Sequence, residues 1–210
     1  MGVDLYWIPL GAGGHSVRLN GRAYEAVLAA VQRRPARDLY HSALVVALRE
    51  GTYAIEMAPV QASSGACRGA VAEGPVGSPL LRRLRLFRYE VRCRLGGVIP
   101  DLDEAVDSPR RLTDDPAVAR RIIDLVAHVP THVWGRDELH CGDMWNSNSL
   151  VAWLIVRSGL DVDAVRPPEG GRAPGWDAGV VAAQGAGARL RRSDRSARSS
   201  STLSSRHTPR

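Results

Sequence analysis

The sequence predicts an α+β domain in which an antiparallel β-sheet packs against a buried helix. Residues 39–48 and 53–57 are strand-like apolar segments on either side of a turn at 49–52, which is the pattern of a β-hairpin. Residues 85–95 alternate apolar and charged side chains, as a half-exposed strand does. Residues 148–158 are apolar nearly all round, which is typical of a helix inside a core.

Shorter signals predict the other elements of the first half of the chain. A short strand is expected over residues 4–10, followed by a glycine loop over 11–14. A helix is expected over about 21–34, where apolar residues recur at i, i+3, i+4 and i+7. Gly, Ala, Ser and Pro predominate over 59–79, and acidic residues over 100–109, so both stretches are expected to be loops.

The second half holds one more helix and one more strand by the same reasoning. The acidic stretch before Pro116 is a helix start, and that helix is expected to run to about Ala127. A last strand is expected over 176–182. We therefore predict one domain over residues 1–184 and a disordered Arg/Ser-rich tail over 185–210.

The charge of the chain is unevenly distributed. The net charge is +6, and residues 185–210 hold seven arginines and one acid, so the remaining 21 basic and 21 acidic residues cancel. Nucleic-acid binding through the tail is a second alternative function, but the tail has no aromatic residue on which a base could stack. No apolar run is long enough for a spanning helix. With three cysteines and no secretory start, we expect a cytoplasmic protein.

Three residues form a candidate catalytic set. His41 lies near the start of an apolar strand, and Ser147 lies where the buried helix begins. A nucleophile at a helix N-terminus gains from the helix dipole, and a histidine can act as its base. Glu56 on the return strand is the candidate that would orient the His41 ring. Asn146 and Asn148 flank Ser147 as candidates for contacting substrate or, through backbone N–H groups, an oxyanion.

Structural readings of the same residues stand beside the catalytic one. His41 is also readable as a packed strand residue, and Asn146 and Ser147 as a helix cap. With the turn at 49–52, Glu56 falls opposite Val45, and Gln61 is a rival orienter nearer the position that faces His41.

Other reactive side chains carry weaker signals. Cys141, six residues before Ser147, is an alternative nucleophile, although it precedes the helix rather than starting it. His128, His132, His140 and Cys141 are metal-ligand types, but Pro130 breaks the helix that such a histidine pair needs. We expect no metal and no cofactor.

The layout of these residues resembles the circularly permuted papain-like hydrolases, which include lecithin:retinol acyltransferase-like and bacterial YiiX-like proteins. His41 matches the base of that group, and Glu56 resembles the third polar position of its YiiX-like branch. The stretch Asn146–Ser149 matches the nucleophile segment, with Ser147 where the group has Cys. The resemblance spans about residues 38–158 and implies a permuted papain-like fold.

The resemblance also implies a function. A hydrolase or acyltransferase of this type would act on an amide or ester bond of a small-molecule, lipid or peptide substrate, with Ser147 as nucleophile and His41 as base. The alternative is a catalytically inactive papain-like protein that binds a ligand or regulates a partner, because a serine hydroxyl needs stronger activation than a cysteine thiol. The oligomeric state and the substrate are not readable from the sequence.

Overall fold

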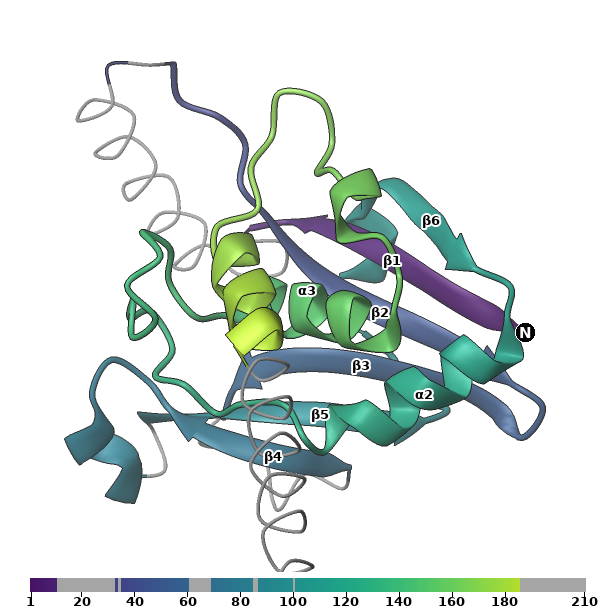
Figure 1. Cartoon of the computed structure of the whole chain (residues 1–210), viewed down its shortest axis with the longest axis horizontal. Coiled ribbons are helices and arrows are strands. Elements are labelled where there is room, and N and C mark those ends of the chain that lie inside the picture. The colour runs from purple at the N-terminus through teal and green to yellow at the C-terminus, as the bar shows by residue number, and fades with distance from the viewer. Residues whose placement is uncertain (11–32, 34, 61–68, 85–86, 100, 186–210) are drawn as a thin grey trace, which may run out of the picture.

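The described part of the chain folds into a single antiparallel sheet. The structure is a computed structural model that describes residues 1–10, 33, 35–60, 69–84, 87–99 and 101–185. Six strands lie in the order β4-β5-β3-β2-β1-β6, and every adjacent pair is antiparallel (Figure 1). The strands are β1 (Gly2–Pro9), β2 (Tyr40–Leu48), β3 (Gly51–Pro59), β4 (Ala70–Pro75), β5 (Arg88–Leu95) and β6 (Val106–Thr113).

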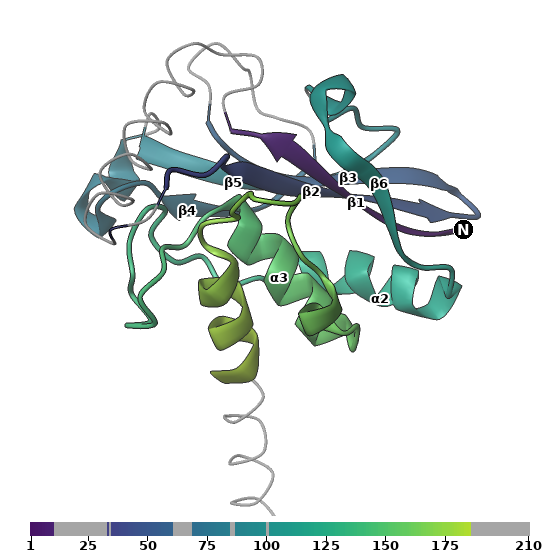
Figure 2. The ribbon, with the colours of Figure 1, turned by 90° about the horizontal axis from the view of Figure 1, so that it is seen from above.

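Three helices cover one face of this sheet. They are α2 (Pro116–Val126), α3 (Ser147–Ser158) and a helix over residues 176–185 (Figure 2). The main core lies between them and the sheet, and it includes the fully buried Trp7, Leu44, Ile122 and Leu154. The predicted α+β class and antiparallel sheet are therefore confirmed. None of the described helices is long and apolar enough to cross a membrane.

Helix α3 begins and ends where its sequence supplies caps. The Asn146 side chain accepts a hydrogen bond from Asn148 N, and Ser149 Oγ accepts one from Asn146 N, which completes a capping box. Gly159 ends the helix with φ 87°, a left-handed conformation that favours glycine. Ten of its twelve residues are buried, as the all-round apolar pattern predicts. The helix starts at Ser147, as expected.

The β2–β3 hairpin is tighter than predicted. Leu48 pairs with Gly51, so the turn consists of Arg49 and Glu50 alone. The residue opposite Val45 is consequently Ala54 and not Glu56, and the expected register was wrong by two positions. Gly51 adopts φ 138°, a backbone conformation open to glycine, and the first pair of the ladder forms there.

Three expectations about loops and strands were wrong. The expected loop 59–79 contains β4, which pairs with β5, and the expected loop 100–109 contains η3 (Leu102–Glu104) and the start of β6. Both strands lie at the edges of the sheet, where Gly and Pro are tolerated, and pairing with a neighbour makes up for their weak strand propensity. The expected strand 176–182 is helical. Its alanines at positions 178, 182 and 183 are buried along one helix face.

The opposite face of the sheet carries a smaller apolar cluster. It consists of Ile8, Ala43, Ala54 and Ile99. In β2, Tyr40, Leu44, Val46 and Leu48 join the main core while Ala43 joins the smaller cluster, so even positions face the helices and odd positions face away. The predicted 11–14 loop, the predicted 21–34 helix apart from residue 33, and residues 186–210 of the predicted tail lie outside the described residues.

Candidate functional site

A small cavity lies at the N-terminal end of α3. Its volume is about 190 Å³. Strand β2, the start of α3 and the loops before them contribute the wall. The lining residues are Leu10, Leu39, Tyr40, His41, Trp134, Met144, Asn146, Ser147, Asn148 and Pro174. The structure thus gathers the expected Asn146–Asn148 stretch and His41 around one cavity, and it supplies mostly apolar walls.

Asn148 ties the start of α3 to strand β2. Ser42 Oγ donates to Asn148 Oδ1 over 2.8 Å, and Asn148 Nδ2 donates to Tyr40 O and Pro174 O. Asn148 is almost fully buried, with only 2% of its surface exposed. All three bonds hold the scaffold together, so the amide of Asn148 is not available to a substrate.

Asn146 is committed to the scaffold as well. Its Oδ1 caps α3 by accepting from Asn148 N, and its Nδ2 donates to Pro174 O over 2.8 Å. A Cβ added to Gly175 would meet the Asn146 amide at 2.2 Å, so the loop can approach this closely only with glycine at that position. The helix-cap reading of Asn146 therefore describes what its side chain does.

Ser147 differs from its two neighbours. It occupies the first position of α3, lines the cavity and is only 5% exposed. Neither its hydroxyl nor its backbone N–H donates a hydrogen bond to any residue that the structure describes. Ser147 therefore offers two unused donors at the positive end of the α3 dipole, next to an apolar space.

His41 lines the same cavity, but its ring belongs to the other face of β2. Ser42 faces α3, and side chains alternate along a strand, so the His41 ring is turned away from Ser147. Its register partner in β1 is Ile8, a member of the smaller apolar cluster. Burial lowers the pKa of His41 from 6.5 to about 4, and Asp101 opposes that shift. The ring is therefore neutral at pH 7.

Glu56 also lies on the face away from the helices. Its Oε1 accepts from Arg92 Nη1 at 3.4 Å and from Arg94 Nη2 at 3.2 Å. Arg92 in turn bonds Glu90 through its Nε at 3.2 Å. These contacts make Glu56 a member of a partly buried ionic cluster on β3 and β5. The rival orienter, Gln61, lies outside the described residues.

The loop before α3 holds the other reactive side chains considered from the sequence. Cys141 contacts Asp137 Oδ1 and Asp143 O through its sulfur, each at 3.7 Å, and burial raises the pKa of its thiol. A raised pKa keeps the thiol protonated and makes it a poor nucleophile. His132 Nδ1 lies 3.3 Å from Glu138 Oε2. Within the described ranges, no three His, Cys, Asp or Glu residues gather as metal ligands would.

Two residues that position the site were missed from the sequence. Ser42 follows His41 and sets which face of β2 meets α3. Asp143 is half-buried and accepts hydrogen bonds from Met144 N, Gly175 N and Asp177 N, so it joins the loop before α3 to the helix over 176–185. Burial raises the pKa of Asp143, while the N–H groups act against that shift. No local pattern marks Asp143, because two of its three partners lie more than thirty residues away.

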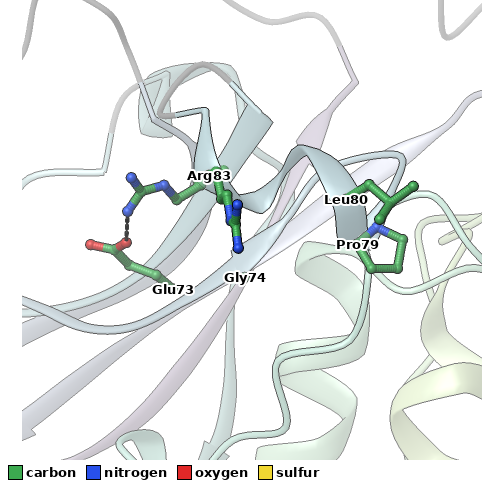
Figure 3. A pocket seen from close by; sticks show the side chains of 6 residues that line it. Glu73, Gly74, Pro79, Leu80 and Arg83 are labelled. Atoms are coloured by element: carbon green, nitrogen blue, oxygen red, sulfur yellow. Dashed lines mark hydrogen bonds and ion pairs between the residues drawn. The ribbon is translucent and has the colours of Figure 1, made fainter.

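A second, wider hollow lies at the β4 edge of the sheet (Figure 3). It measures about 760 Å³ and is lined by residues of β4, η1 (Pro79–Arg83) and β5. Its Glu73 carboxylate is paired with Arg88 at 3.0 Å. Leu80, which is 88% exposed, stands at its rim. No residue from α3 or β2 lines it, so it is separate from the cavity that holds Ser147.

Comparisons with family models, with curated proteins and with solved structures give no match. The resemblance to permuted papain-like proteins thus stays a prediction, and the candidate function rests on the geometry of the cavity.

Proposed function

We propose that the chain is a ligand-binding protein with a permuted papain-like arrangement, and that it binds a small molecule in the cavity beside Ser147 without using Ser147 and His41 as a catalytic pair. The observation that carries this proposal is the buried hydrogen bond between Ser42 and Asn148. It sets the face of β2 that meets α3, and with it the direction of the neighbouring His41 ring.

The requirements of serine catalysis support this proposal. A serine hydroxyl is a weak nucleophile unless a base lies within hydrogen-bond reach, and the base needs an orienting group in turn. The His41 ring is turned to the far face of the sheet, and Glu56 is held by Arg92 and Arg94. An apolar wall with two free donors at Ser147 suits binding and does not need a base.

Labelling of the full chain with a fluorophosphonate probe tests the proposal. We expect no labelling that depends on Ser147, because no base activates the hydroxyl. Ser147→Ala is the control for specific labelling. Labelling of the unchanged protein that Ser147→Ala abolishes would overturn the proposal and establish a serine hydrolase.

A cysteine at the same position gives a second readout. We expect Ser147→Cys to react slowly with iodoacetamide, at the same rate with and without His41→Gln. A fast reaction that His41→Gln slows would mean that the ring reaches the nucleophile position, and it would contradict the proposal. Circular dichroism of each variant confirms that the fold is kept.

A hydrolase or acyltransferase acting on an amide or ester is the second candidate function. One observation favours it: Ser147 and His41 line the same cavity, and the free N–H of Ser147 suits an oxyanion. Turning the His41 ring toward α3 would require β2 to present its other face, which the core side chains on its present inner face oppose. The two labelling experiments separate this candidate from the binding protein.

A further inference from the structure

We propose that the cavity beside Ser147 selects an uncharged, apolar molecule of about six to nine non-hydrogen atoms with one hydrogen-bond acceptor, which Ser147 binds through its free hydroxyl and N–H. This inference rests on the proposed function in one respect, which is that the ligand binds in this cavity. It holds whether the ligand is released unchanged or is a substrate.

The size of the ligand follows from the volume of the cavity. A protein cavity of about 150 Å³ holds one benzene molecule, and the cavity beside Ser147 measures about 190 Å³. A ring with one small substituent fills that space. A long acyl chain would leave most of its carbons outside.

The apolar character of the ligand follows from the walls. Leu39 and Tyr40 are buried and contribute from the start of β2, while Met144 and Pro174 contribute from the loops around α3. Trp134 adds an aromatic face. Aliphatic, thioether and aromatic walls together favour a ring or a compact hydrocarbon group.

The acceptor follows from the unused donors. Ser147 is 5% exposed, and its hydroxyl makes no hydrogen bond to a described residue, so this donor is free for an acceptor on a ligand. The neighbouring amides do not compete for a ligand, because Asn146 and Asn148 are bonded to Pro174 O and to the cap. The first turn of α3, a helix of twelve residues, adds the positive end of its dipole.

The absence of charge on the ligand follows from the lining. Among the described residues that line the cavity, none carries an ionised side chain at pH 7, since His41 is neutral there. A carboxylate would therefore be buried without a cation. The half-buried carboxylate of Asp143, which accepts a hydrogen bond from the cavity residue Met144, disfavours an anion further. A neutral carbonyl, amide or ether oxygen suits the site.

Titration of the full chain with matched probes tests this inference. We use benzamide, ethylbenzene and benzoate at pH 7, with hexadecanamide as a long-chain probe, and measure Kd by NMR chemical-shift titration. Benzamide is expected to bind about three- to tenfold more tightly than ethylbenzene, the worth of one hydrogen bond, and more tightly than benzoate or hexadecanamide. Ser147→Ala removes the hydroxyl and keeps the backbone N–H, so the preference for benzamide over ethylbenzene should fall by about threefold while ethylbenzene binds as before.

A serine at the other end of α3 is the matched control. Ser158 is equally buried, but its hydroxyl already donates to Ile155 O, so Ser158→Ala should leave the benzamide preference unchanged. Tighter binding of benzoate or of hexadecanamide, a preference insensitive to Ser147→Ala, or no saturable binding of any probe would each overturn the inference. Fluorophosphonate labelling of Ser147 that benzamide blocks would overturn the non-catalytic function alone and would support the ligand class.

Discussion

Two adjacent residues at the start of α3 play opposite parts. Asn148 is almost fully buried and joins Ser42, Tyr40 and Pro174, whereas the side chain of Ser147 has no partner among the described residues. The residue with the strongest polar contacts is therefore structural, and the residue with none is the one left for a ligand. Contacts that are already satisfied stabilise the fold, and unused donors are what a ligand can exploit.

Stability measurements should separate these two residues. Asn148→Ala removes the hydrogen-bond partner of the buried Ser42 hydroxyl and one donor each from Tyr40 O and Pro174 O, and we expect it to lower the free energy of unfolding by about 2–4 kcal/mol. Ser147→Ala should change that free energy by less than about 0.5 kcal/mol. Urea denaturation of both variants measures the difference. Equal losses would mean that Ser147 has a structural partner after all.

His41 predicts a loss of stability in mild acid. Its pKa is about 4 in the folded protein and 6.5 in the unfolded chain, so below pH 6.5 the unfolded chain binds the proton and the folded protein does not. The stability that the neutral His41 ring contributes is fully present above about pH 6.5, and it is lost as the pH falls to about 4. The loss is at most about 3–4 kcal/mol, at about 1.4 kcal/mol for each pKa unit.

A variant without the titrating ring isolates this effect. We expect His41→Gln to flatten the dependence of unfolding free energy on pH between 6.5 and 4, relative to the unchanged protein. Thermal unfolding at several pH values measures it. A pH dependence identical in both proteins would show that the His41 ring is solvated rather than buried.

The loop before α3 is hydrogen-bonded to the start of the helix over 176–185, which lies far away in the sequence. Asp143 lies in the loop before α3 and accepts hydrogen bonds from Gly175 N and Asp177 N. It therefore caps the start of the helix over 176–185, although it lies more than thirty residues before that helix. Trp176 of that helix packs against Trp7 of β1, with ring centroids 5.3 Å apart. The cavity wall at Pro174 thus depends on Asp143 being in place.

Removal of the Asp143 carboxylate should destabilise the helix over 176–185 before the rest of the fold. We expect Asp143→Ala to cost about 1–3 kcal/mol, because backbone N–H groups at the helix start lose their acceptor. Faster amide hydrogen exchange over residues 178–183 should accompany the loss. The control is Asp177→Ala, whose side chain is exposed. If that variant loosens the helix as much, the Asp143 cap is not the cause.

The last described residues that belong to the main core lie in the helix over 176–185. Ala178, Ala182 and Ala183 are buried against the same cluster that contains the strand and helix side chains. The excess positive charge lies beyond them, in the seven arginines after residue 185.

Two truncations test where the folded body ends. Deletion of residues 186–210 should change the free energy of unfolding by less than about 0.5 kcal/mol, since every core residue that the structure describes precedes residue 186. Deletion of 176–210 should cost about 3 kcal/mol or more, because it uncovers the main core. Urea denaturation of both chains gives the comparison. A large loss from the shorter deletion would place part of the stable fold beyond residue 185.

Local patterns in the sequence predicted the elements that carry their own signals. The hairpin, the buried helix with its Asn146 cap and its Gly159 end, and the helix that starts at Pro116 all follow from periodicity and capping residues close in the chain. Local patterns also singled out Ser147 and His41, and both residues line the cavity.

Long-range contacts decided the rest. Strands β4 and β6 have weak local propensity and form because β5 and β1 pair with them, and the helix over 176–185 is capped by Asp143 from another part of the chain. The direction of the His41 ring depends on which face of β2 is covered by α3. The Ser42–Asn148 contact shows that the even-numbered residues of β2 lie on the covered face. A strand alternates with a period of two, so the packing of one helix determines which of two adjacent residues, His41 or Ser42, faces the start of α3.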